Sequence, residues 1–585
     1  MCGIAALFGQ LPEREARARI EKMTHVVSHR GPDGMGAIVL SGAALGHRRL
    51  SIIDLSDDAI QPMTTPDQTV WITFNGEIYN YLELREELEK EGVQFRTKSD
   101  TEVLLQAYLH WGKSCLSRLN GMFAFVIYDK GKIFAARDRF GVKPLYYWKD
   151  QEGTLYFASE IKQFTTLPTW RARLHHQRAH DFLQWGISEH ESETLFLGVK
   201  QLRGGEYYDT SPKRWYTLPT NTFQGDEEEA KELLKSHLEA SIRLRLRADV
   251  PVGSCLSGGI DSSSLVTLAH HLGHSLHTFS VRSEVKAFDE GEYLQAVLAK
   301  TACKNSSTIP SVDAFFEQLD KLIWHQEMPF GGTSIFAQWE LFRLIQESGI
   351  KVVLDGQGAD EIFGGYNLFF GLRLAELVRT GSWGAFLKEL KSTRTLNPIL
   401  HLVKELLPEP LQQFLLRKMG KPSLKNSWLT LAAEDRLAMP RSKTVKEEML
   451  QQILCSSLPQ LLHTEDRNSM AHGVESRTPF LDYSFVEYAT SLPTHFSHRT
   501  GRSKWILREA LADVLPEKIA KRRTKLGFAT AEPHWILSRV KRFREEERRA
   551  IESANGVIKE GCYEGPRLMR VITFGRWMEC FHVQV

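Results

Sequence analysis

Cys2 is the first residue of the chain whose position suggests chemistry. The sequence opens MCGIAALFG, so removal of Met1 would place a free α-amine on the residue that carries the thiol. A thiol has an ordinary pKa of about 8.5 and an α-amine one of about 8, so the amine could take the thiol proton at neutral pH. Cys2 is therefore a candidate nucleophile with its own base attached.

An acyl intermediate on Cys2 would need hydrogen-bond donors for its oxyanion. Asn75 and Gly76, in TFNGEIYN, offer a side-chain amide and a backbone N–H, which we expect on a turn after a strand. Arg49, in GHRRLSIIDL, could hold a substrate carboxylate through two parallel hydrogen bonds. Asp100, in KSDTEVLL, could pair with an α-ammonium group or simply cap a helix. Residue types alone do not establish an amidase.

Two glycine-rich loops further along the chain are candidates for phosphate binding. In SCLSGGIDSSSLV, residues 254–266, an apolar strand runs into a loop of glycines and serines, whose backbone N–H and hydroxyl groups can donate to an anion. The lysine of a Walker-type loop is absent. In KVVLDGQGADEIFGGY, residues 351–366, a second strand ends in an acidic loop. Asp261 and Asp360 could therefore hold Mg²⁺ on bound phosphates; the alternatives are a plain turn and solvated acids at a helix start.

The first 165 or so residues are expected to position the cysteine chemistry. They contain short β-rich segments separated by turns, with amphipathic helices over 81–92 and 100–112, the second with Asp100 as its N-cap. This pattern predicts a layered α+β domain.

The phosphate loops belong to a second region. Pro, Thr, Gly and Asn gather between about 204 and 226, which predicts a linker. From Val250 onward strands alternate with helices, which predicts a parallel sheet covered on both faces. Beyond about residue 370 the chain has mostly helical patterns.

Bulk composition excludes several functional classes. The chain has 585 residues, enough for two or more domains, and its net charge of about +2 gives no reason to expect nucleic acid or an acidic membrane surface as a partner. Its seven cysteines are scattered without a CxxC pair, which indicates neither a zinc cluster nor a disulfide framework. With no signal-like start and no 18-residue apolar run, we expect a cytoplasmic protein.

Together these motifs closely resemble those of the glutamine-hydrolysing asparagine synthetase family. CGIAALFG, SHRGPDG, HRRLSIIDLS, FNGEIYN and RDRFGVKPLYY resemble the class II glutamine amidotransferase domain. SCLSGGIDSS, GADEIFGGY, DRNSMAHGVESRTPFLD, KWILREAL and RRTKLGF resemble the synthetase domain.

The resemblance implies a domain organisation. Residues 2–205 would form an Ntn-type αββα sandwich, 206–228 a linker, and 229–550 an α/β domain with a parallel sheet and a pyrophosphate loop, similar to the adenine nucleotide alpha hydrolases, with a helical C-terminal part. Residues 551–585 match no motif of the family.

The resemblance also implies a mechanism. Cys2 would attack the side-chain amide of glutamine, releasing ammonia and leaving a thioester that water clears. An acceptor carboxylate, aspartate in asparagine synthetases, would attack the α-phosphorus of ATP and form an acyl-adenylate. Ammonia from an internal channel would then displace AMP. Mg²⁺ would accompany ATP, and the family suggests a homodimer.

The family's binding residues carry over by motif. The glutamine pocket would comprise Arg49, Ile52, Asn75, Gly76, Glu77 and Asp100. ATP would contact Leu256, Ser257, Gly258, Gly259, Asp261, Ser262, Val281, Asp355 and Gly356, with Asp261 and Asp360 on Mg²⁺. Lys525, in RRTKLGF, would stabilise charge on the phosphates during adenylation.

Two positions depart from the family pattern. The second loop reads DGQGADE instead of SGEGADE, so Gln357 replaces a glutamate tied to adenylate formation and proton transfer. A neutral amide cannot accept a proton as a carboxylate does. Arg282 follows Val281 in place of a smaller residue, and its charge would favour a more anionic acceptor unless it faces solvent. Either another group, with Asp355 the nearest candidate, takes the proton, or the acceptor is not aspartate.

Three hypotheses follow. The leading one is asparagine synthesis from aspartate, ATP and glutamine. The second is an amidotransferase of the same mechanism that acts on another carboxylate, such as a sugar acid or a secondary metabolite. The third is a non-catalytic scaffold that has kept the fold.

Overall fold

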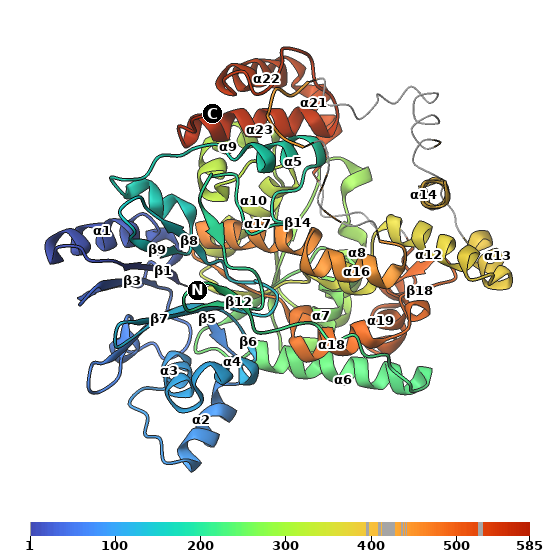
Figure 1. Cartoon of the computed structure of the whole chain (residues 1–585). Coiled ribbons are helices and arrows are strands. Elements are labelled where there is room, and N and C mark those ends of the chain that lie inside the picture. Colours follow the sequence, from blue (N-terminus) through green and yellow to red (C-terminus); the bar gives the residue numbers. More distant parts are fainter. Residues whose placement is uncertain are drawn as a thin grey trace.

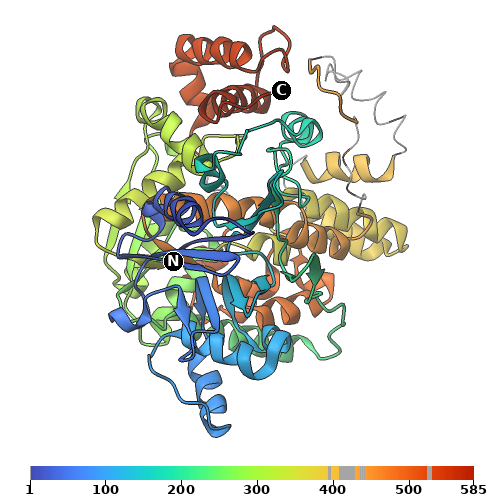
Figure 2. The same ribbon diagram turned by 60° about the vertical axis from the view of Figure 1, so that its left-hand side comes forward.

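The N-terminal part of the chain forms two six-stranded antiparallel sheets (Figures 1 and 2). The computed structural model describes residues 2–392, 397–407, 411, 428–434, 437, 439, 442–523 and 530–585. The first sheet has the order β10 (Lys200–Gln201), β8 (Tyr146–Lys149), β9 (Leu155–Ala158), β1 (Gly3–Phe8), β3 (Ala43–Arg49) and β2 (Gly34–Leu40). The second has the order β12 (Pro212–Arg214), β11 (Glu206–Tyr208), β7 (Lys132–Arg137), β6 (Gly121–Asp129), β5 (Val70–Ile78) and β4 (Met63–Thr64).

Alternating apolar residues join the two sheets face to face. In β1, Ile4 and Ala6 pack against Ala124 and Val126 of β6, whereas Leu7 points to the opposite face, where α1 (Glu13–His25) lies. Helices α2 (Tyr81–Lys90) and α3 (Asp100–Trp111) pack beside the second sheet in a separate apolar cluster. The order helix, sheet, sheet, helix confirms the αββα sandwich.

Helix α1 was not among the helices that the sequence predicted. Its apolar residues Ala16, Ile20 and Met23 are buried and spaced four and three residues apart, which is the period of one helix face. The many charged residues of EREARARIEKMTH obscure this short apolar stripe.

The second sheet also extends into the segment that the sequence predicted as a linker. β11 and β12 lie between residues 206 and 214, and the Tyr207 ring packs 5.7 Å from that of Phe134. Helix α6 (Glu227–Arg245) follows, with Asp226 as its N-cap. The first part of the predicted linker, up to Arg214, is therefore an edge of the sheet. The sequence did not predict this because Tyr207, which makes the apolar contact, stands among polar residues.

The C-terminal half contains a five-stranded parallel sheet. Its order is β15 (Asn305–Thr308), β14 (His277–Val281), β13 (Val252–Cys255), β16 (Val352–Leu354) and β17 (Glu475–Arg477). Phe279 and Val353 pack on α10 (Ser334–Glu347), whereas Leu354 belongs to the cluster that contains α6 and α7 (Ile260–His271). The sheet is thus covered on both faces, as predicted. β15 and β17 were not predicted.

Helices make up most of the rest of the described C-terminal half, and beyond about residue 370 this was predicted. They include α8 (Gly291–Thr301), α9 (Val312–Gln326), α11 (Ala359–Phe363), α12 (Asn367–Arg379), α13 (Trp383–Ser392), α14 (Asn397–Leu406), α16 (Val445–Leu454), α17 (Ser457–Ala471), α18 (Tyr483–Ser491), α19 (Trp505–Ala510), α20 (Glu517–Ala520), α21 (Glu532–Ser538), α22 (Val540–Ser553) and α23 (Pro566–Cys580). A short hairpin, β18 (His498–Arg499) and β19 (Arg502–Ser503), precedes α19. None of the helices in the described ranges has the length and apolar character needed to span a bilayer.

The C-terminal segment that the sequence left uninterpreted joins the two halves. Helix α23 packs against α9 and against α5 (His176–Trp185), at the opposite end of the molecule from α2 (Figure 1). The backbone N–H of Gln584 donates to the Ala172 carbonyl at 2.9 Å, and the N–H of Leu174 donates to the Gln584 carbonyl at 2.7 Å. Trp577 is fully buried against Phe196, and its Nε1 donates to the Glu327 carbonyl at 2.8 Å.

We expect Trp577→Ala to lower the free energy of unfolding by about 3–5 kcal/mol, because it leaves a cavity the size of an indole between the two halves. Thermal denaturation would measure this as a lower Tm. As a control, Leu537→Ala removes a side chain that is 76% exposed and should change stability by less than about 0.5 kcal/mol. Equal Tm values for the two variants would contradict the assigned role of α23.

Candidate active sites

Cys2 lies buried at the start of β1, next to the middle strands of both sheets. Its backbone N–H donates to Oδ1 of Asn75 at 2.9 Å, and its carbonyl accepts a hydrogen bond from Nε of Arg30 at 2.9 Å. Burial raises the pKa of the Cys2 thiol, although a hydrogen bond from the backbone of Leu50 opposes the shift. The thiol therefore needs an adjacent base to become a thiolate, which is the role predicted for a free α-amine.

The predicted oxyanion donors, Asn75 and Gly76, lie inside β5 and not on a turn after it. Asn75 is completely buried, and its Nδ2 has no hydrogen-bond partner among the described residues. Leaving such a donor unpaired costs about 1–3 kcal/mol, so an acceptor supplied by a ligand would complete the site. Gly76 adopts φ +154°, and a Cβ there would come within 2.1 Å of the Met122 carbonyl oxygen. Only glycine fits at this point of the strand.

Two acids lie near the end of β5: Glu77, within the strand, and Asp100, in the first turn of α3. Asp100 was predicted as the N-cap of α3, but Ser99 takes that role by accepting from the N–H of Thr101. The Asp100 carboxylate instead accepts from the N–H of Ile78 at 3.0 Å. Burial raises the pKa of Asp100 to about 6. Burial also raises the pKa of Glu77 well above its usual range, and the neighbouring charge of Glu475 adds to this shift.

Arg49 and Ile52, which the family resemblance places in the glutamine pocket, lie at the end of β3 and in the following loop. The two terminal nitrogens of Arg49 donate to the Ser56 carbonyl, at 2.7 Å, and to the Asp54 carbonyl. A substrate carboxylate would have to share the guanidinium with these loop groups. Ile52 is buried against Val352 of the second half, so its side chain belongs to the contact between the halves.

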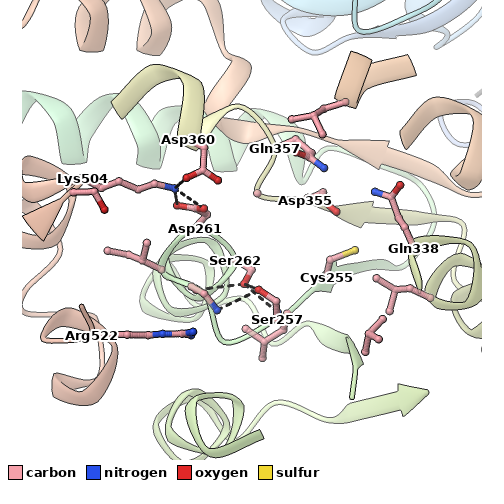
Figure 3. Close-up of a pocket in the computed structure, with 18 of the residues that line it drawn as sticks. Cys255, Ser257, Asp261, Ser262, Gln338, Asp355, Gln357, Asp360, Lys504 and Arg522 are labelled. Atoms are coloured by element: carbon pink, nitrogen blue, oxygen red, sulfur yellow. Dashed lines mark hydrogen bonds and ion pairs between the residues drawn. The ribbon is translucent and has the colours of Figure 1, made fainter. Parts of the chain in front are cut away.

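The two phosphate loops meet in a cavity of about 280 Å³ at the carboxyl ends of β13 and β16, which are neighbours in the parallel sheet (Figure 3). Nine of the residues predicted to bind ATP or Mg²⁺ line it: Leu256, Ser257, Gly259, Asp261, Ser262, Val281, Asp355, Gly356 and Asp360. Gly258 turns the first loop with φ +82°, and a Cβ there would come within 2.9 Å of the Leu294 nitrogen.

Hydrogen bonds hold the first loop in a fixed shape. The backbone N–H of Ser257 donates to Oγ of Ser262 at 3.1 Å, the two hydroxyl oxygens are 3.1 Å apart, and the N–H of Gly259 donates to Oγ of Ser257 at 3.2 Å. Helix α7 starts directly behind them. Hydroxyls and the N-terminus of a helix thus face the cavity together, an arrangement suited to a phosphate chain.

Asp261 and Asp360 converge as predicted, and a lysine that the sequence analysis had not singled out lies between them. Nζ of Lys504 is 2.5 and 2.6 Å from the two oxygens of Asp261 and 2.7 Å from Oδ1 of Asp360 (Figure 3). Burial opposes a charge on Lys504, but the two carboxylates raise its pKa above the usual range and keep it cationic. Its position in KWILREAL was the only available signal.

The same end of the cavity carries further positive charge. Arg508, Arg522 and Arg523 line it together with Lys504, and Nη1 of Arg522 donates to the Gly258 carbonyl at 3.0 Å. A cluster of cations beside the serine loop suits a polyphosphate. Lys525 lies outside the described residues, so its predicted role stays a prediction.

The other side of the cavity is formed by Cys255, Gln338, Asp355 and Gln357 (Figure 3). Burial raises the pKa of Asp355, while hydrogen bonds from the Cys255 thiol and from the N–H groups of Gly356 and Gln357 oppose the shift. This side of the cavity thus presents an acid and neutral polar groups, whereas the opposite side carries the cationic cluster.

Arg282, the second departure from the family pattern, is matched by a local partner. Its Nε and Nη2 donate to the two oxygens of Asp289 at 2.6 and 2.7 Å. It is not among the residues that line the cavity. Its charge therefore gives no support to a more anionic acceptor.

A small cavity of about 10 Å³ lies between the N-terminal and C-terminal halves. Val142 and Lys143 line it from the N-terminal half, whereas Leu462, Glu465, Asp466, Ser469, Ser476 and Thr478 line it from the other. Beside it, Nη1 of Arg30 donates to Glu160 and to Asp466, both at 2.8 Å. Buried polar groups thus link the Cys2 backbone to the C-terminal half beside this cavity.

Comparison with known proteins gives matches to both halves. Residues 1–218 match the glutamine amidotransferase domain family, and residues 233–564 match the asparagine synthase family. The chain is 32% identical to asparagine synthetase [glutamine-hydrolyzing] 1 of Bacillus subtilis, over 92% of this chain and 88% of that protein. It is 30% identical to a putative asparagine synthetase of Mycobacterium tuberculosis, over 92% and 88%, and 31% identical to amidase chyE of Penicillium rubens, over 89% and 87%. The chain therefore belongs to the asparagine synthase family and carries a glutamine amidotransferase domain at its N-terminus.

Proposed function

We propose that the protein converts L-aspartate, L-glutamine, ATP and water into L-asparagine, L-glutamate, AMP and pyrophosphate. One observation carries the proposal. A buried cysteine beside an unpaired amide donor lies in the N-terminal half, a nucleotide-sized cavity at the strand ends lies in the C-terminal half, and a small polar cavity lies between the halves. One half could release ammonia from glutamine, and the other could activate a carboxylate to receive it.

The first step would take place at Cys2 after removal of Met1. The α-amine accepts the thiol proton, and the thiolate attacks the amide carbon of glutamine. Nδ2 of Asn75 and the N–H of Gly76 donate to the oxyanion. The amine then gives its proton to the leaving nitrogen, which departs as ammonia, and water hydrolyses the glutamyl thioester. Asp100 would hold the α-ammonium group of glutamine, and Arg49 its α-carboxylate.

The second step would take place in the nucleotide cavity. The acceptor carboxylate attacks the α-phosphorus of ATP, and pyrophosphate leaves into the loop of Ser257 and Ser262, where Lys504 and the arginines offset its charge. Mg²⁺ would be held by Asp261 and Asp360 in place of Lys504, whose ammonium group bridges the two carboxylates in this structure, and would supply further charge stabilisation. No group of three or more metal-ligating side chains occurs in the described ranges, so phosphate oxygens would complete its coordination.

The identity of the acceptor is the open part of the proposal. Gln357 lines the cavity where the family has a glutamate, and this favours a second candidate, amidation of another carboxylate by the same mechanism. A relative named as an amidase, chyE, matches the chain about as well as the named asparagine synthetases do. A cytoplasmic location and a homodimer stay predictions from the sequence.

ATP–pyrophosphate exchange with a panel of carboxylic acids, starting with L-aspartate, would identify the acceptor. We expect exchange with aspartate that chelation with EDTA abolishes and Mg²⁺ restores, because the Asp261 and Asp360 carboxylates would repel the phosphates without a cation between them. Exchange with another acid, and none with aspartate, would favour the second candidate. Exchange with no acid would support a non-catalytic scaffold.

We expect Cys2→Ala to abolish glutamate release from glutamine while ammonium chloride still supports amide synthesis, because the nucleotide cavity does not contain Cys2. Glutamate and AMP assays measure the two activities separately. Cys562→Ala, which changes an exposed thiol, is the matched control and should behave like the unmodified chain. Retained glutaminase activity in Cys2→Ala, or an intact mass that includes Met1 in active enzyme, would contradict the assignment.

The kcat/KM for glutamine hydrolysis should fall as the pH drops below about 6. The pKa of Asp100 is raised to about 6, so at pH 5 about nine in ten molecules carry a neutral Asp100 that cannot pair with an ammonium group. We expect an approximately tenfold loss between pH 7 and pH 5, measured as initial rates at low glutamine. Asp100→Asn should have a lower kcat/KM at pH 7 and should lose the dependence on pH. If kcat/KM of this variant still fell toward acid pH as before, the titrating group would be another residue.

A further inference from the structure

Amide formation from an acyl-adenylate requires a proton acceptor. The nitrogen of ammonia forms a bond to the acyl carbon, the bond from that carbon to the AMP oxygen breaks with its electron pair on the phosphate, and the nitrogen must lose one proton. Gln357 cannot take this proton, because an amide is not a base at neutral pH.

Glu465, on α17, is a buried carboxyl with an unused oxygen. Its side chain is 3% exposed, and its Oε1 accepts a hydrogen bond from the Ser476 hydroxyl. Oε2 has no hydrogen-bond partner among the described residues. Buried carboxylate oxygens are rarely left unpaired, so a ligand that donates a hydrogen is the simplest explanation.

Glu465 borders the small cavity between the halves. This cavity of about 10 Å³ is large enough for about one water-sized molecule. Leu461, four residues earlier and therefore on the same face of α17, lines the nucleotide cavity. One face of one helix thus borders both spaces.

The charges around Glu465 suit a group that gains and loses a proton. Burial raises its pKa well above the usual range, and the negative charges of Asp355, at the end of β16, and of Asp466 raise it further. Lys143, from the N-terminal half, and the Ser476 hydroxyl of β17 act in the opposite direction. The carboxylate therefore has a much higher proton affinity than an exposed glutamate.

We propose that Glu465 accepts the proton that the ammonia nitrogen loses as it attacks the acyl-adenylate, in place of the glutamate that is absent at position 357. Glu465 would hydrogen-bond the incoming ammonia through Oε2, take one proton as the carbon–nitrogen bond forms, and release it after AMP leaves. This inference rests on the proposed amidation.

The test is Glu465→Gln, assayed with the acid that supports exchange, L-aspartate in the first instance. We expect glutamate release and ATP–pyrophosphate exchange within about twofold of the unmodified chain, and amide formation reduced by about 100-fold with either glutamine or ammonium chloride as nitrogen source. Glu465→Asp should recover part of the rate. Glu347→Gln, an exposed acid on α10, is the matched control and should leave every rate unchanged.

A pH profile separates a proton acceptor from a structural residue. Amide formation by the unmodified chain should fall toward acid pH as Glu465 becomes protonated, and this limb should disappear in Glu465→Gln. Normal amide formation in that variant would overturn the proposal. A loss of amide formation with glutamine but not with ammonium chloride would also overturn it, because Glu465 would then act in the passage of ammonia. A parallel decrease of ATP–pyrophosphate exchange and of Tm would overturn it as well, because it would indicate a structural role. If the unmodified chain activates no acid, the proposed function fails first and this inference fails with it.

Discussion

The buried guanidinium of Arg30 is the contact on which both active sites depend. It is completely buried, holds the Cys2 carbonyl through Nε, and bridges Glu160 of its own half to Asp466 of the other half. Burial works against its charge, and the two carboxylates compensate for it. Loss of both acids would leave an unpaired buried charge, at a cost of about 3–5 kcal/mol. The geometry of the nucleophile is therefore coupled to the packing of the two halves.

The coupling extends from Asp466 through α17 to the C-terminus. Arg467 pairs with Glu327 at 2.8 Å, and the Glu327 carboxylate also accepts from the backbone N–H of Lys162 in the N-terminal half. The carbonyl of the same Glu327 holds Nε1 of Trp577. Burying one of these charged side chains alone would be costly, but the Glu327 carboxylate has partners from both halves. Trp577 of α23 adds apolar surface beside them. This explains how a segment outside the family's motifs supports the relative placement of the two sites.

Sequence reasoning succeeded where the signal is local. The loop that contains Asp261 and the loop that contains Asp360 each follow a strand, and parallel strands bring such loops to one edge of a sheet. It failed where the partner is distant or the local signal is ambiguous. Lys504 meets Asp261 across 243 residues, a contact that no local pattern encodes. Asp100 was predicted as the helix cap because aspartate and serine are equally common caps, and the sequence does not show that the preceding Ser99 takes this role.

The replacement of a glutamate by Gln357 does not remove acid from the loop but moves it to Asp355, at the end of β16. There the Cys255 thiol and two backbone N–H groups stabilise the charged form of the carboxylate and oppose the rise in its pKa that burial causes. Its negative charge acts on Glu465, whose Oε2 is unpaired. Asp355 is thus held by three hydrogen bonds and acts on Glu465 through its charge, whereas Glu465 keeps an unpaired oxygen that can accept a proton in the proposed mechanism.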